Sequence, residues 1–214
     1  MWHIMEHFCK EQMIVGMAKM VESRDDYTGG HIKRTSDVVK ILVDEMRKDR
    51  TLMYPNEFYS AVISAAPMHD LGKIAIDDQI LRKTGKFNDE EIKTMRTHAE
   101  RGAVIVENLL AEIDDPFFVQ VAKNMAYYHH ERWNGEGYPK GLSKENIPLE
   151  ARIMAIADSY DALVSKRSYK QRVSFTEAYE IILDAMGKKF DPGLLKYFMG
   201  CQGLLRKYYM SNER

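Results

Sequence analysis

The chain has 214 residues, of which 45% are hydrophobic and 29% are charged, and this length can bury the core of one large domain or two small ones. Its formal net charge of −1 gives no overall electrostatic reason to bind polymeric nucleic acid, and no apolar run reaches the ~20 residues of a membrane-spanning helix. Two cysteines, Cys9 and Cys201, are too few for a disulfide framework and are typical of a protein in the reducing cytoplasm.

Apolar residues recur at every third or fourth position along most of the chain, so the pattern predicts helices rather than strands. We expect the methionines of the first helix to lie in the hydrophobic core. The segment 71–87 has no regular pattern, and Asn88 with Glu91 resembles a capping box that opens the helix after it. Helices are predicted over 9–21, 32–46, 88–98, 103–113, 116–130, 149–165, 175–186 and 191–205. A further helix is predicted to start at Pro55-Asn56 and to have His69-Asp70 near its C-terminal end.

Three glycines and a proline interrupt the helical pattern over 131–142, which predicts a shaped loop. Arg132, Trp133 and Tyr138 flank these glycines, and the aromatic rings could stack on a nucleotide base or simply pin the loop. No linker is evident, so we expect one all-α domain over 1–210 and a frayed tail over 211–214.

Two acidic residues lie where a buried metal ligand would be expected. Asp70 directly follows His69 at the end of an apolar run, and an imidazole beside a carboxylate suits a divalent metal ion, although such a pair alone is weak evidence. Asp158 follows the apolar run 153–157, so we expect it to be largely buried. A buried carboxylate is costly unless it is paired or bound to a metal.

Five histidines lie at predicted helix ends or beside acidic residues and add to these two aspartates. Each histidine alone is more often a hydrogen-bonded or exposed residue than a ligand. Together the set exceeds what one metal ion needs, and two ions ~3.5–4 Å apart would use it fully. No cysteine lies near these residues, which argues against a structural zinc site, and the ligand types suit iron, manganese, zinc or nickel. The set is His31, His69, Asp70, His98, His129, His130 and Asp158.

Basic residues near these candidate ligands indicate a phosphate substrate. Lys73 lies one helical turn after Asp70, and Arg167 and Lys170 follow the predicted helix that carries Asp158. Cations that converge on a metal centre are typical of phosphate recognition. The alternative is that each of them is a solvated surface charge.

In these motifs the chain resembles the HD-GYP family of cyclic di-GMP phosphodiesterases, a branch of the HD metal-dependent phosphohydrolases, over about residues 22–198. Five motifs in the family's order carry the resemblance. They are Thr28-Gly29-Gly30-His31 within 25–34; His69-Asp70-Leu71-Gly72-Lys73; 81–87 with His98 and Gly102; His129-His130-Glu131 with Gly137-Tyr138-Pro139; and Ala151-Arg152-Ile153 with Asp158, Asp161, Arg167 and Lys170.

The resemblance implies an HD-type helical bundle with a shaped Gly-Tyr-Pro loop, in which the seven candidate ligands bind two divalent metal ions. Iron or manganese is expected first, and zinc or nickel is the alternative. Asp70 would bridge the ions and act in catalysis together with Lys73. Some family members place a ligand to a third metal four residues before the position of His31, and Tyr27 stands there instead. The residues implied to contact substrate are Lys73, Tyr138, Asp161, Arg167 and Lys170.

The implied reaction is hydrolysis of cyclic di-GMP by a hydroxide that bridges two metals, giving pGpG and, after a second cut, GMP. Two alternatives stay open: an HD hydrolase of another cyclic dinucleotide or nucleotide, and a cyclic-dinucleotide sensor or interaction module without turnover. The complete ligand set disfavours the second. Implied partners are diguanylate cyclases, through the Gly-Tyr-Pro loop, and a second copy of the chain. Because family members usually carry a regulatory domain, we expect that domain to lie elsewhere, or the chain to be a fragment.

Overall fold

The computed structural model describes residues 2–24, 30–165 and 172–211, and the side chains from residue 12 onward. Within these ranges no β-strand forms, which confirms the all-α prediction. The α-helices are α1 (Trp2–Glu22), α2 (His31–Met46), α3 (Asn56–Ala65), α4 (Asp78–Leu81), α5 (Asp89–Leu109), α6 (Pro116–Tyr128), α7 (Leu149–Val164), α8 (Phe175–Asp184) and α9 (Leu195–Ser211). The 3₁₀ helices are η1 (Ala66–Met68), η2 (Leu71–Ala75), η3 (Lys144–Asn146) and η4 (Pro192–Leu194).

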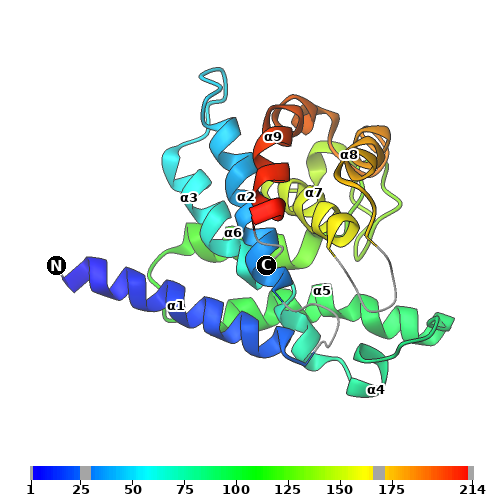
Figure 1. Cartoon of the computed structure of the whole chain (residues 1–214). Helices are drawn as coiled ribbons and strands as arrows, with labels where there is room; N and C mark the ends of the chain where they lie inside the picture. Colours follow the sequence, from blue (N-terminus) through cyan, green and yellow to red (C-terminus); the bar gives the residue numbers. More distant parts are fainter. Residues whose placement is uncertain (1, 25–29, 166–171, 212–214) are drawn as a thin grey trace.

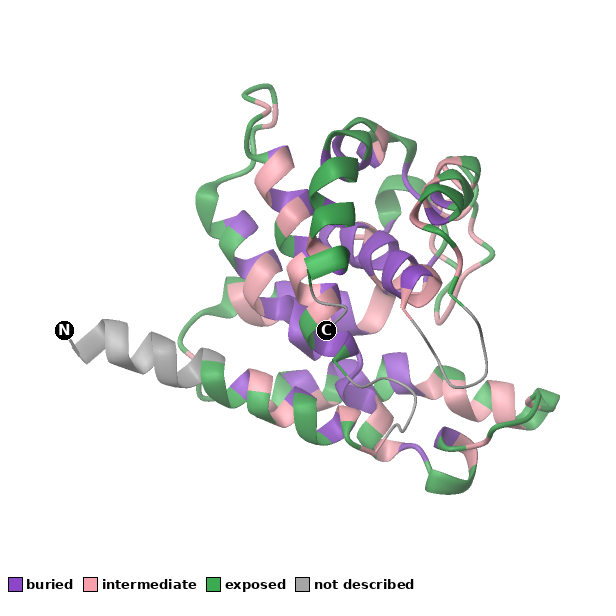
Figure 2. Ribbon diagram, viewed as in Figure 1, coloured by how far each residue is buried: buried purple, intermediate pink, exposed green. Residues whose placement is uncertain are grey.

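Helices α2 and α7 form the centre of the bundle and pack against each other (Figure 1). Helix α9 also packs on α2, α6 packs on α3, α5 and α7, and α1 crosses below (Figure 1). The apolar run predicted in α7 is buried on almost every side, as Figure 2 shows, and Met154 and Ile156 of this helix are fully inaccessible. No helix in the described part of the chain combines the length and apolar character needed to cross a membrane.

Helix α5 shows where the local prediction was right and where it was wrong. The capping box is confirmed, because Asn88 Oδ1 accepts from the N–H of Glu91 (2.9 Å) and Glu91 accepts from the N–H of Asn88 (2.8 Å). The two predicted helices 88–98 and 103–113 are one continuous helix. The segment 71–87 is also more regular than expected, since it contains η2 and α4.

The methionines of α1 do not form the core stripe that the sequence suggested. Met13 is 57% exposed and Met20 is 71% exposed, so the prediction is wrong for these two residues. Among the described side chains of α1, the buried ones are Ile14, Ala18 and Val21, which are spaced by four and three residues on one narrow face. Because α1 packs mainly against η1 and η2, only this face is covered.

A close approach between η2 and α5 depends on the absence of a side chain at Gly72. A Cβ atom there would lie 1.9 Å from the carbonyl oxygen of His98 and 2.5 Å from the nitrogen of Gly102. Both neighbours are backbone atoms, so neither can rotate away. Gly72 therefore sets how near the candidate ligands Asp70 and His98 can come to each other.

Gly72→Ala is expected to lower the free energy of unfolding by about 3 kcal/mol, the upper end of the usual cost of overpacking a core. Gly203→Ala in α9 is the matched control, since a Cβ there meets nothing within 4 Å. It is expected to stabilise the protein by up to about 1 kcal/mol through helix propensity. Urea denaturation of both variants measures the difference. Equal stability of Gly72→Ala and the unmodified protein would contradict the close packing described for η2.

Candidate metal centre

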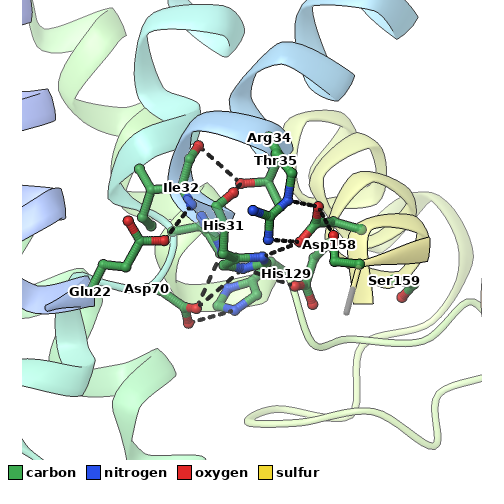
Figure 3. Close-up of polar contacts among 12 residues, drawn as sticks. Glu22, His31, Ile32, Arg34, Thr35, Asp70, His129, Asp158 and Ser159 are labelled. Carbon is green, nitrogen blue, oxygen red and sulfur yellow. Dashed lines mark hydrogen bonds and ion pairs between the residues drawn. The ribbon is translucent and has the colours of Figure 1, made fainter. Parts of the chain in front are cut away.

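The candidate ligands from five parts of the chain converge on one place in the bundle. Figure 3 shows His31, Asp70, His129 and Asp158 pointing toward one another from α2, the η1–η2 junction, the end of α6 and α7. The ligand atoms form two groups, and within each group they lie within 4.8 Å of one another. The first group is Asp70, His98, His129 and His130, and the second is His31, His69 and Asp158.

The carboxylate of Asp70 lies between the two groups. Its Oδ1 is 3.4 Å from Nε2 of His98 and 3.8 Å from Nε2 of His129. Its Oδ2 is 3.4 Å from Nε2 of His69 and 3.9 Å from Nε2 of His31. One oxygen therefore faces each group, which is the arrangement that a bridging carboxylate needs.

The orientation of the histidine rings is fixed by the nitrogen that faces away from the centre. A backbone carbonyl or a carboxylate can only accept, so each Nδ1 bonded to one must carry the proton. The neutral ring then presents the lone pair of Nε2 to the centre, as in metal-binding histidines. The Nδ1 atoms donate from His31 to Asp161 (2.7 Å), from His69 to Ala66 (2.9 Å), from His98 to Met95 (2.7 Å) and from His129 to Ala126 (3.0 Å).

Buried nitrogens without a partner show that these residues fit a metal ion. Nε2 of His69 and Nε2 of His129 are inaccessible and make no hydrogen bond in the structure. Leaving such a polar atom unsatisfied costs ~1–3 kcal/mol. Burial lowers the pKa of His129 to about 3 and also lowers the pKa values of His98 and His130, so these rings keep their lone pairs at neutral pH. The donor set of imidazoles and carboxylates suits a divalent transition metal.

Lys73 lies where its spacing from Asp70 predicted. Its Nζ is 2.8 Å from Oδ2 of Asp70. Burial alone would raise the pKa of Asp70, but the charge of Lys73 and the nearby ring of His69 hold this pKa well below its usual range. Asp70 is therefore a carboxylate at neutral pH, as a metal ligand must be.

Asp161 does not lie where a substrate contact was expected. Its side chain is 0% exposed and lies behind His31, and it accepts hydrogen bonds from four residues in the described part of the chain. Asp161 orients His31, and the expected contact with substrate does not fit this burial. The donors are Nδ1 of His31 (2.7 Å), Nε of Arg34 (2.6 Å), the hydroxyl of Ser165 (2.8 Å) and the hydroxyl of Tyr209 (2.7 Å).

The start of α2 is fixed by a second carboxylate. Glu22 at the end of α1 accepts a hydrogen bond from the N–H of Ile32 (2.9 Å), which satisfies one of the free donors of the first helical turn (Figure 3). This bond fixes the backbone next to His31, and the hydrogen bond that His31 donates to Asp161 fixes its ring. The position of this ligand therefore depends on α1 and α7 as well as on its own helix.

The glycine-rich loop places Tyr138 at the edge of the first group. The ring of Tyr138 stacks on His130, with centroids 4.7 Å apart, and the guanidinium of Arg96 lies 5.1 Å from the same ring. The buried carboxylate of Glu131 accepts from the N–H groups of Lys140 (2.7 Å) and Leu142 (3.1 Å) and so ties the two ends of the loop together.

Trp133 pins the start of this loop, as one of the two interpretations of the aromatic residues suggested. Its ring lies 5.9 Å from the guanidinium of Arg152, and Arg152 is bonded to the buried carboxylate of Asp191 (2.5 Å). The N–H of Trp133 also donates to the carbonyl of Lys189 (3.1 Å). These contacts connect the loop to α7 and to the turn before η4.

Some predicted residues lie outside the described ranges, and some residues near the centre were not predicted. The residues outside the described ranges are Arg167, Lys170 and Tyr27, so their expected roles remain predictions. The residues near the centre that were not predicted are Arg96 and Tyr209. Arg96 precedes His98 by two residues, which could have drawn attention to it, whereas no sequence signal connects Tyr209 with Asp161.

Comparisons with known proteins identify the family of this chain. A family model described as HD domain matches residues 17–194. A cyclic di-GMP phosphodiesterase of Vibrio cholerae is 39% identical over 90% of this chain and 40% of its own length. A 3′3′-cGAMP-specific phosphodiesterase 2 of the same organism is 35% identical over 88% of this chain and 34% of its own length. The chain thus spans less than half the length of these relatives.

The fold also matches a solved structure. An HDG"Y"P protein from Bdellovibrio bacteriovorus aligns with a TM-score of 0.59 and 20% identity, over 82% of this chain and 51% of that one. This identity supports the fold alone. The family model and the curated relatives together cover the segments that supply all seven ligands. The chain therefore belongs to the HD domain family and, within it, to the HD-GYP branch.

Proposed function

We propose that this chain hydrolyses a phosphodiester bond of cyclic di-GMP and gives pGpG as its first product. The observation that carries the proposal is Asp70, whose two oxygens face two separate groups of ligands. The name of the relative from Vibrio cholerae, a cyclic di-GMP phosphodiesterase, supports the choice of substrate.

The two groups of ligands would each hold one divalent metal ion, with iron or manganese first among the candidates. Bound there, the ions would lower the pKa of a water molecule and stabilise the charge that develops on the phosphate. The protein would keep Asp70 ionised through Lys73 and keep His98, His129 and His130 neutral through burial. Lys73 would also attract the phosphate, and Tyr138, which stacks on His130, would contact a guanine base together with the neighbouring Arg96.

A second substrate, 3′3′-cGAMP, deserves the same test because one relative is named as specific for it. Both compounds are cyclic dinucleotides with two phosphates, so the metal centre alone would not distinguish them. The choice would depend on contacts with the bases, for which Tyr138 and Arg96 are the candidates. A sensor without turnover is the remaining alternative.

The test is to load the protein with manganese, or with iron under anaerobic conditions, and to separate the products by chromatography. Cyclic di-GMP is expected to give pGpG, and a chelator is expected to stop the reaction. Cleavage of 3′3′-cGAMP alone would replace the proposed substrate. Binding of cyclic di-GMP without any product from a metal-loaded sample would favour the sensor and overturn the enzyme.

Partners and compartment extend the same proposal. The loop 131–142 exposes Asn134, Glu136 and Lys140, and these side chains offer polar contacts to a diguanylate cyclase or to a second copy of the chain. The low cysteine content favours the cytoplasm. We treat 1–210 as one catalytic domain, and of its expected tail only Ser211, the end of α9, lies in the described part.

A further inference from the structure

Lys189 reaches the edge of the metal centre from a part of the chain that belongs to none of the motifs. It lies in the turn between α8 and η4, and its Nζ donates to the hydroxyl of Ser159 (2.7 Å). Ser159 follows the candidate ligand Asp158 on α7, and Figure 3 shows the two residues side by side. The ammonium group is therefore held near the half of the centre that contains Asp158.

Main-chain hydrogen bonds join this turn to the start of the glycine-rich loop. The N–H of Trp133 donates to the carbonyl of Lys189 (3.1 Å), and the N–H of Asn134 donates to the carbonyl of Lys188 (2.9 Å). Arg132 directly precedes these two donors. Two cations, Lys189 and Arg132, therefore come from segments whose backbones are fixed against each other.

Neither of these cations forms an ion pair with a residue that the structure describes, although Lys189 lies close enough to Asp158 for the charges to interact. Lys189 contacts a hydroxyl and the ring of Phe190 (5.1 Å), and it forms no ion pair. Burial lowers the pKa of the Lys189 ammonium group, and repulsion from Arg132 lowers this pKa further. The negative charge of Asp158 acts in the opposite direction and raises it. A partly buried cation beside a second cation is unfavourable unless an anion binds there.

We propose that Lys189 and Arg132 form a second anion-binding position, which holds the phosphate of the cyclic dinucleotide that is not being cut. This inference rests on the proposed function, because a cyclic dinucleotide carries one phosphate for the metal centre and another at a fixed distance from it. Lys73 serves the first phosphate, next to Asp70, and the new position lies on the side of Asp158. The competing explanation is structural, namely that Lys189 only holds Ser159 in place.

The test compares Lys189→Met with Lys188→Met, its exposed neighbour. Two substrates are used: cyclic di-GMP, with two phosphates, and bis(p-nitrophenyl) phosphate, with one. Lys189→Met is expected to raise KM for cyclic di-GMP about tenfold, as the loss of one charge-assisted contact implies, with kcat and metal content unchanged. Its KM for the small diester is expected to stay the same. Lys188→Met is expected to match the unmodified protein with both substrates.

Two results would overturn the second anion-binding position. One is an unchanged KM for cyclic di-GMP in Lys189→Met. The other is an equal change with both substrates together with a loss of metal, which would make the residue structural. If the unmodified protein cuts only the small diester, the proposed substrate fails separately. In that case, inhibition of small-diester cleavage by inorganic sulfate tests the second anion-binding position. Weaker inhibition of Lys189→Met than of the unmodified protein supports this position, and equal inhibition excludes it.

Discussion

Asp70→Ala is expected to lose both metal ions and to lower turnover of cyclic di-GMP roughly a thousandfold or more, because metal ions contribute several kcal/mol of transition-state stabilisation. The carboxylate faces both groups of ligands, with each oxygen 3.4 Å from the nearest histidine nitrogen. Its removal deprives each group of a negative charge and leaves mainly neutral imidazoles. Metal content by plasma mass spectrometry and product formation by chromatography measure the two effects.

The control for this variant is Asp114→Ala, an exposed aspartate in the connection between α5 and α6. It is expected to keep full metal content and full turnover. The number of ions lost in Asp70→Ala is informative in itself. Loss of one ion would assign Asp70 to a single group, and full metal content would exclude it as a ligand.

Asp161→Asn is expected to destabilise the protein by about 3 kcal/mol at pH 7, because removing one partner of a buried ion pair leaves the other uncompensated. The carboxylate receives hydrogen bonds from His31, Arg34, Ser165 and Tyr209, and an amide would replace its charge. Metal affinity is expected to fall about 10-fold to 100-fold, the usual effect of losing a group that orients a ligand histidine.

The stabilisation from Asp161 depends on pH in a defined direction. Burial would raise its pKa, but the hydrogen bonds and charges of His31 and Arg34 hold it well below its usual range. A lowered pKa in the folded state means that the stabilisation is complete above the pKa of the unfolded chain, ~3.9 for aspartate, and is lost as the pH falls toward the folded value. The difference between the unmodified protein and Asp161→Asn is therefore expected to be constant from pH 7 to pH 5 and to shrink below pH 4.

Asp37→Asn is the matched control on the surface of α2. Asp37 also accepts from a lysine and a tyrosine, Lys33 and Tyr208, but its side chain is 34% exposed. Its substitution is expected to cost no more than about 1 kcal/mol. Urea denaturation at several pH values, with and without metal, separates the variants. A difference for Asp161→Asn that stays constant down to pH 3 would contradict the lowered pKa.

The helices could be predicted from the sequence because their buried faces repeat with helical spacing. The apolar run before Asp158 indicated a central helix, and α7 is buried almost throughout. The interruption of α5 at Gly102 was not real, because this glycine is explained by the close approach of η2 rather than by a turn. The exposure of Met13 and Met20 could not be predicted, because it depends on which face of α1 packs against the rest of the protein.

The set of candidate ligands that converge could be predicted because their chemistry lies in residue type and order along the chain. The residues that support them could not, because their roles depend on which segments meet. Asp161 lies near the candidate phosphate-binding residues in the sequence, which suggested a substrate contact. Only the structure shows that it lies behind His31. Lys189 and Tyr209 are ordinary residues in the sequence and become significant through contacts 30 and 48 positions away.

The most direct test of this account is a crystal structure of the manganese-loaded protein with anomalous diffraction data. We expect two anomalous peaks ~3.5–4 Å apart, one on each side of the Asp70 carboxylate. One peak is expected among His98, His129 and His130, and the other among His31, His69 and Asp158. A single peak, or two peaks that do not share Asp70, would contradict the two-metal centre.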